Sequence, residues 1–208
     1  YLIEERLAAA FGAKIPIAQA CGHMIVDIGG GSTEAAVISL GGVVVHKSAR
    51  VAGNKLDEAI SNYVKKTHNL IIGERMAEMI KMTIGDALPD KEEKKMEVRG
   101  RDTVNGMPRM IELTREEVSE ALRPVLHQIV GAVKAVLEET PPELAADIID
   151  KGIVMAGGTS LLKNFDRLMT QATGVPCHVA EEALLCVVRG TGVALENIEL
   201  YKRSVSRK

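Results

Sequence analysis

Three consecutive glycines follow a short apolar segment that ends in an acid. Asp27 closes the segment 24–27, and the glycines at 29–31 lead directly into Ser32 and Thr33. Glycine lets the backbone turn N–H groups closely onto a phosphate, and the two hydroxyls can add hydrogen bonds. Asp27 is placed to hold Mg²⁺ through the water molecules that this ion retains. The pattern favours a phosphate-binding hairpin, with a tight turn that merely needs glycine as the alternative. No Lys follows the glycines, which excludes a Walker A loop.

A second glycine turn lies far along the chain. The apolar residues 153–155 predict a buried strand, and Gly157, Gly158 and Thr159 follow it. Such a turn can bring backbone against the flat face of a nucleoside. Strand–glycine–helix turns are also common structural elements, so this turn alone is weak evidence. Two glycine turns with an insert between them indicate a nucleotide site more strongly than either one does.

Hydrophobic periodicity and turn residues predict the elements of the first half of the chain. An antiparallel meander of three strands is expected at 24–27, 35–40 and 43–46. Asn54 is expected to cap a helix over 55–66, and residues 70–89 are expected to form more helix that closes at Pro89. A hairpin is expected from strands at 97–99 and 110–113 and a turn at 105–106.

The second half of the chain alternates helices and strands. Thr114 and Glu117 form a capping-box pattern that predicts a long helix ending before the prolines at 141–142. The remaining expected elements are a strand at 153–155, a helix at 160–171, a strand at 175–179 and a helix at 183–197. This order predicts an α/β chain with a core made of 1–53 and 115–208 and an inserted α+β subdomain at 54–114.

The composition excludes several classes of protein. Hydrophobic residues make up 46% and charged residues 26%, which is typical of a soluble globular chain. The net charge of -2 gives no indication of a nucleic-acid partner. Cys21, Cys177 and Cys186 are too widely spaced to predict a zinc site or a disulfide framework.

The first glycine turn resembles the second phosphate loop of the ATPase superfamily that contains actin, heat-shock chaperones and sugar kinases. The resembling stretch runs from Val26 to Glu34. Within the superfamily the chain looks like the MreB family of bacterial actin-like cell-shape proteins. The other segments that carry this resemblance lie at 1–5, 8–10, 36–42, 56–60, 72–75, 97–102 and 140–148, and together they cover nearly the whole chain.

The resemblance implies an actin-like ATPase fold, of which this chain is the C-terminal, ribonuclease-H-like lobe and from which the N-terminal lobe is missing. It implies ATP and Mg²⁺ as cofactors, and ATP hydrolysis coupled to polymerisation in the full-length parent but not in this chain alone. The implied partners are further copies of the protein, the cell-wall elongation machinery, and the inner membrane surface through the missing lobe. The implied location is the cytoplasm, at the inner face of the membrane.

Roles for individual residues follow from the same resemblance. Glu5 and Glu4 match an acidic pair that positions the attacking water, with Glu5 preferred, and Asp27 matches the acid associated with the metal. Ser32 stands where the family usually has a Thr that helps to place that water. The residues expected to bind nucleotide are Gly29, Gly30, Gly31, Ser32, Thr33, Glu78, Lys81, Gly157, Gly158 and Thr159.

Two positions depart from the family pattern, and two other classes of protein remain as alternatives. Arg6 replaces a usual Pro, and loss of this Pro is expected to shift the Glu5 carboxylate. Thr159 replaces a usual third Gly. A chaperone-type ATPase would continue into a substrate domain after the last helix. A sugar or acetate kinase would need a cluster of sugar-binding acids and amides, which the sequence does not show.

Overall fold

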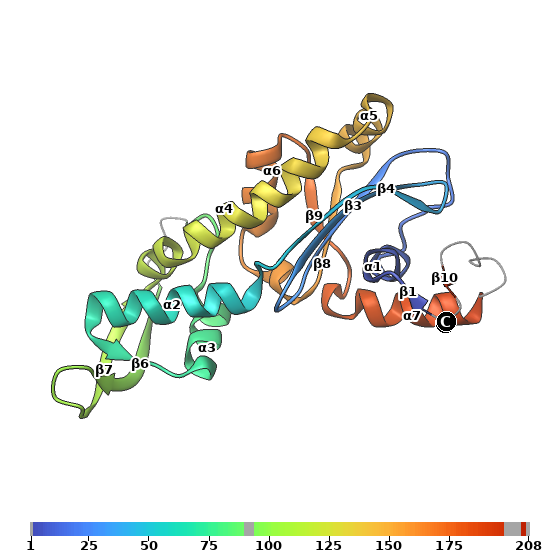
Figure 1. Cartoon of the computed structure of the whole chain (residues 1–208). Coiled ribbons are helices and arrows are strands. Elements are labelled where there is room, and N and C mark those ends of the chain that lie inside the picture. The colour runs from blue at the N-terminus through green and yellow to red at the C-terminus, as the bar shows by residue number, and fades with distance from the viewer. Residues whose placement is uncertain (1, 90–93, 198–204, 207–208) are drawn as a thin grey trace.

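A five-stranded mixed sheet lies at the centre of the computed structural model, which describes residues 2–89, 94–197 and 205–206 (Figure 1). β2 (His23–Ile28), β3 (Thr33–Ser39) and β4 (Gly42–Ala49) form an antiparallel meander, as predicted. β8 (Ile153–Ala156) pairs in parallel with β2, and β9 (Cys177–Val179) pairs in parallel with β8. The strand order is therefore β4-β3-β2-β8-β9.

Helices cover both faces of this sheet, because alternate side chains of a strand point to opposite faces. Ile25 packs in a hydrophobic cluster with residues of α1 (Glu5–Gly12) and α7 (Cys186–Glu196). Its neighbours Met24 and Val26 belong to a second, larger cluster on the other face. The helices that contribute to this larger cluster include α4 (Arg115–Glu139), α5 (Pro142–Lys151) and α6 (Phe165–Thr173). Figure 1 shows α4 running along one side of the sheet, with α1 and α7 on the other.

A separate three-stranded antiparallel sheet has the order β5-β6-β7. Its strands are β5 (Leu70–Ile71), β6 (Lys95–Asp102) and β7 (Pro108–Thr114), and it packs with α2 (Gly53–His68) and α3 (Glu74–Ile84). The predicted hairpin of the insert is thus confirmed, and Gly106 takes the positive φ of +76° that its turn requires. The large hydrophobic cluster runs through both sheets, from Val26 to Val98. The subdomain limits at 53/54 and 114/115 remain a prediction.

The helix predicted over 55–66 is confirmed as α2, but two other details predicted for the insert were wrong. Asn54 does not cap α2, because the helix begins at Gly53 with Ala52 as its N-cap residue. The backbone N–H of Asn54 instead donates to the carbonyl of Gly30. The expected continuous helix over 70–89 is split into β5 and α3, and α3 ends at Ile84 rather than at Pro89.

The second half of the chain confirms the capping box and corrects the elements that follow. Thr114 Oγ1 accepts from Glu117 N, and Glu117 Oε2 accepts from Thr114 N, at 3.3 and 2.9 Å. Helix α5 was not predicted. The helix expected at 160–171 is a 3-10 turn, Gly158–Leu161, followed by α6, and the last helix is preceded by a 3-10 turn at Ala183–Leu185. β1 (Leu2–Ile3) pairs with β10 (Val205–Ser206).

Candidate nucleotide-binding site

The two predicted glycine turns lie side by side at one edge of the central sheet. β2 and β8 are parallel neighbours, with Asp27 opposite Ala156, so the turns that follow these strands begin at the same edge. Thr159 Oγ1 donates to the carbonyl of Gly29 at 2.7 Å. Gly157 packs so closely that a Cβ there would lie 2.5 Å from Asp27 Oδ1. The structure therefore brings Asp27 and both turns together.

In the hairpin after β2, backbone carbonyls accept hydrogen bonds from the rest of the protein, whereas several backbone amides are available to a ligand. Gly29 N donates to Ser32 O at 3.0 Å, which closes the turn. The carbonyls of Gly29 and Gly30 accept from Gly53 N at 3.1 Å and from Asn54 N at 2.8 Å. Within the described part of the chain, the amides of Gly30, Gly31 and Ser32 have no hydrogen-bond acceptor. Three successive amides without acceptors are suited to binding an anion such as phosphate.

Asp27 is a buried acid in a negatively charged setting. Its side chain lies at the end of β2, only 5% of the residue is exposed, and burial raises its pKa to about 6. The charges of Glu5 and Glu34 add to this rise in pKa. A divalent cation nearby would relieve the repulsion among the three carboxylates. Among the described residues no group of three or more His, Cys, Asp or Glu is arranged to hold a metal directly.

The raised pKa of Asp27 makes a prediction about stability. A carboxyl whose pKa rises on folding, here from 3.8 to about 6, stabilises the fold below pH 3.8 and loses that contribution as the pH rises through 6. Asp27→Asn removes the charge and is expected to raise the free energy of unfolding at pH 7.5 by about 1–3 kcal/mol. The gain should vanish near pH 4. Urea unfolding of this chain at both pH values measures it.

The control for this experiment is Asp150→Asn, because Asp150 is an exposed acid on α5. This variant should leave the free energy of unfolding unchanged at both pH values. An Asp27→Asn variant that is less stable than the wild type at pH 7.5 would contradict the assignment of a costly buried charge.

The structure separates the two acids of the predicted pair. Glu4 is half-exposed and accepts from Arg6 Nε at 2.7 Å. Arg6 Nη1 also lies 3.4 Å from Glu34 Oε2. The Arg that replaces the usual Pro therefore links the start of α1 to β3. Glu5 is the first residue of α1, and its charge contributes to the raised pKa of Asp27. Of the two acids, Glu5 is the one whose charge raises the pKa of Asp27.

The two predicted hydroxyls have different surroundings. Thr33 is completely buried, and its Oγ1 donates to the carbonyl of Val51 at 2.6 Å. Its hydroxyl therefore holds β3 to the segment before α2, and the structure does not support the predicted phosphate contact for it. Ser32 is half-buried, and within the described residues its hydroxyl makes no hydrogen bond. Ser32 is thus the hydroxyl of this hairpin that remains available to a ligand.

Glu78 and Lys81, both expected to bind nucleotide, line different hollows. Lys81 Nζ donates to Asp57 Oδ2 at 2.9 Å and to the carbonyl of Gly53 at 3.4 Å, so it lies at the start of α2. Glu78 lines a 660 Å³ hollow between α2 and α3, together with Asn54 and Asp57. Lys81 lines a separate pocket of 460 Å³.

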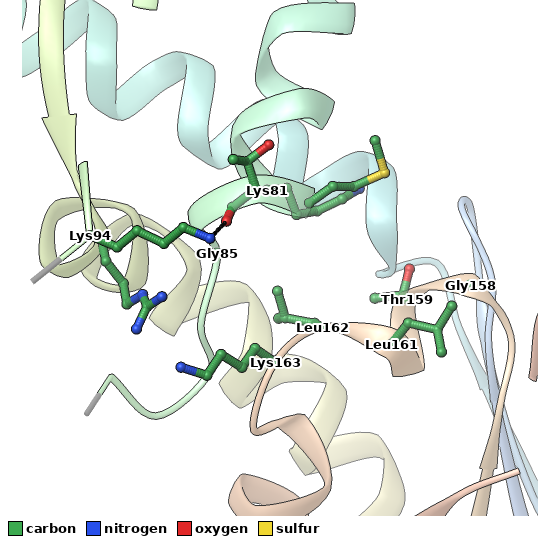
Figure 2. A pocket seen from close by; sticks show the side chains of 11 residues that line it. Lys81, Gly85, Lys94, Gly158, Thr159, Leu161, Leu162 and Lys163 are labelled. Carbon is green, nitrogen blue, oxygen red and sulfur yellow. Dashed lines mark hydrogen bonds between the residues drawn. The ribbon is translucent and has the colours of Figure 1, made fainter. Parts of the chain in front are cut away.

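This second pocket has Gly158 and Thr159 on one side (Figure 2). Leu161 and Leu162 supply apolar wall, as does Met82 of α3. Figure 2 shows Lys94 and Lys163 at the end away from Gly158 and Thr159. Apolar walls with a few polar groups suit the flat face of a nucleoside. The pocket lies beside the turn whose Thr159 donates to Gly29 of the hairpin after β2.

Comparison with known proteins identifies the family. The model of the MreB/Mbl protein family matches residues 1–203. The chain belongs to the MreB/Mbl family. It is 52% identical over 201 residues to the cell shape-determining protein MreB of Escherichia coli (strain K12), which covers 97% of this chain and 58% of that protein. It is 49% identical over 207 residues to the cell shape-determining protein Mbl of Bacillus subtilis (strain 168), covering 99% and 62%.

Solved structures confirm the predicted actin-like ATPase fold. MreB5 of Spiroplasma citri bound to AMPPNP superposes with a TM-score of 0.91 at 38% identity, over 96% of this chain and 60% of that one. The MamK double helical filament superposes with a TM-score of 0.73 at 21% identity, which supports the fold alone. This MreB/Mbl chain therefore spans about three fifths of the length of these relatives.

Sequence reasoning about this MreB/Mbl chain missed several residues of the site. Glu34 lies opposite Asp27 across the β2–β3 pair, and its charge raises the Asp27 pKa. Gly53 and Asp57, on α2, contact the hairpin and Lys81 respectively. For Glu34, the alternation of side chains between the two faces of a strand could have indicated its position. For the two residues of α2 no local pattern exists, because their partners are far away in the sequence.

Proposed function

We propose that this chain supplies one side of an ATP site in an actin-like filament protein. The hairpin 29–32 would bind phosphate through its amides, and the pocket between α3 and the second glycine turn would bind the adenosine. Asp27 would hold Mg²⁺ through water, and bound Mg²⁺ would neutralise phosphate charge during phosphoryl transfer to water. Glu5 would orient the attacking water. The observation that carries this proposal is the hairpin itself, with three available amides beside a buried acid.

The relatives support a nucleotide as the ligand. Two structures of Spiroplasma citri MreB5 are described as bound to AMPPNP and to ADP, and this chain superposes on them with TM-scores of 0.91 and 0.92. The departures from the family pattern are compatible with this ligand, because Thr159 adds a hydrogen bond between the two turns and Arg6 makes ion pairs at the start of α1.

For the whole protein we propose polymerisation with ATP into filaments at the inner face of the membrane, where they organise cell-wall synthesis and determine cell shape. The names of the Escherichia coli and Bacillus subtilis relatives support the role in cell shape. Further copies of the protein and the wall-elongation machinery would be its partners. Membrane contact would come from the preceding lobe, and within the described ranges no helix is long and apolar enough to span a membrane.

The isolated 208-residue chain is expected to bind ATP weakly and to hydrolyse it negligibly. Half of the phosphate contacts would come from the other lobe, and water competes for phosphate oxygens at an open hairpin. Isothermal titration calorimetry and a phosphate-release assay on the purified chain measure both quantities. Micromolar or tighter binding with steady turnover would show that the chain is a complete enzyme and would refute the proposed division of the site.

A further inference from the structure

Three segments that are distant in the sequence meet at one carbonyl oxygen. Gly29 O accepts from Thr159 Oγ1 at 2.7 Å and from Gly53 N at 3.1 Å. The hairpin after β2, the turn after β8 and the start of α2 are therefore joined at a single point, which we call the Gly29 junction. Thr159 is 8% exposed and also lines the 460 Å³ pocket. One side chain thus contacts both proposed parts of the nucleotide site.

The Gly29 junction sets the direction of a hairpin amide. A peptide unit is planar and trans, so the carbonyl of Gly29 and the N–H of Gly30 point in opposite directions from the same plane. Because Gly53 N and Thr159 Oγ1 donate to the carbonyl of Gly29, the N–H of Gly30 points away from α2 and from Thr159. The carbonyl of Gly30, held by Asn54 N at 2.8 Å, does the same for the Gly31 amide. Peptide units between glycines rotate easily. The hydrogen bonds to the carbonyls of Gly29 and Gly30 therefore fix the orientation of the amides in this turn.

The space at the junction is matched to the Thr159 hydroxyl. A Cβ added to Gly53 would lie 2.7 Å from Thr159 Oγ1, whereas its next neighbours, Gly29 O and Lys81 Nζ, would lie at 3.4 and 3.5 Å. A larger residue at position 53 would therefore displace this hydroxyl first. The glycine at 53 and the hydroxyl at 159 form one packing unit.

We propose that Thr159 is a positioning residue that orients the phosphate hairpin from the nucleoside pocket. This inference rests on the proposed nucleotide site and adds a role that glycine cannot perform at position 159. Loss of the hydroxyl leaves Gly29 O with Gly53 N as its one donor, so the peptide plane that carries the Gly30 amide is held less firmly. Binding of the phosphate groups should weaken, while binding of the nucleoside alone should not.

The test compares Thr159→Ala, which removes the hydroxyl, with Thr159→Ser, which keeps it. NMR titrations of the 208-residue chain with ADP and with adenosine, at constant Mg²⁺, give two dissociation constants for each variant. Thr159→Ala is expected to weaken ADP binding about five- to tenfold, the effect of one lost hydrogen bond, and adenosine binding less than twofold. Thr159→Ser should stay within about twofold of the wild type for both ligands.

The outcomes distinguish this inference from the proposed function. The positioning role is wrong if Thr159→Ala binds ADP as tightly as the wild type does. It is also wrong if Thr159→Ala loses affinity for ADP and for adenosine by the same factor. If the wild type binds neither ligand at millimolar concentrations, the proposed weak binding of nucleotide by this side of the site is refuted. Thermal unfolding of each variant checks that the fold is retained.

A double-mutant cycle tests the Gly29 junction independently. Gly53→Ala should displace the Thr159 hydroxyl and weaken ADP binding about as much as Thr159→Ala does. In the Thr159→Ala background the hydroxyl is absent, so Gly53→Ala should add less than about a twofold further loss. If the losses in ADP affinity multiply in the double variant, Gly53 and Thr159 act independently, and the proposed role of the Gly29 junction is wrong.

Discussion

Replacing Asp27 by asparagine in the full-length parent protein is expected to lower ATP turnover by at least about a hundredfold while the fold is retained. Asparagine keeps the size of the side chain but cannot carry the negative charge that attracts Mg²⁺. The charge of Asp27 lowers the stability of the fold, because burial and two neighbouring acids disfavour the ionised carboxylate and raise its pKa to about 6. A charge that is unfavourable for folding, close in the chain to backbone amides without acceptors, is consistent with the proposed ligand site.

The measurement is phosphate release at saturating ATP and Mg²⁺, with sedimentation of the polymer as a second readout. Asp150→Asn, on the exposed surface of α5, serves as the matched control and should retain full turnover. Asp27→Asn should combine lost turnover with higher stability at pH 7.5. Metal-dependent turnover at the wild-type rate in Asp27→Asn would refute the role of this acid.

Replacing Glu5 by glutamine in the full-length parent is expected to lower kcat by about 10²–10³-fold and to change ATP affinity by less than about threefold. A group that orients the attacking water acts mainly in the transition state, so its loss affects kcat more than binding. Glu5 begins α1, and its charge is felt at Asp27. The measurement combines steady-state turnover with an equilibrium binding assay for ATP.

Glu4→Gln is the matched control, because Glu4 is the neighbouring acid and its carboxylate pairs with Arg6 at 2.7 Å. We expect this variant to keep turnover within about threefold of the wild type. A larger fall in kcat for Glu4→Gln than for Glu5→Gln would show that Glu4 is the water-positioning acid. A collapse of ATP affinity in Glu5→Gln would indicate a direct role of Glu5 in nucleotide binding.

Elements that depend on neighbours in the sequence were predicted well. The meander β2-β3-β4 follows from short apolar runs separated by glycines, and the start of α4 follows from the Thr114–Glu117 capping box. Elements that depend on distant partners were not. β5 has only two residues and exists because Leu70 and Ile71 pair with Asp102 and Arg101, which no pattern within 70–89 indicates.

The same distinction applies to the candidate site. The residues Asp27, Gly157 and Gly158 were singled out from local sequence, and the structure brings them together. Thr33 was expected to contact phosphate because it follows the glycines, but its hydroxyl donates to Val51, across the β3–β4 pair. Availability of a polar group depends on every neighbour in space, and sequence proximity to a motif does not reveal it.

The sequence by itself determined the family, the glycine turns and the acid at the end of β2, because these are properties of residue type and short spacing. Only the tertiary structure decided which groups remain available to a ligand. The bond from Thr159 to Gly29 spans 130 positions and exists because β2 and β8 are parallel neighbours. The pKa of Asp27 likewise depends on burial and on Glu5 and Glu34, which different elements bring beside it. Hydrogen bonding and charge act over a few ångströms in space, so the folded chain decides them.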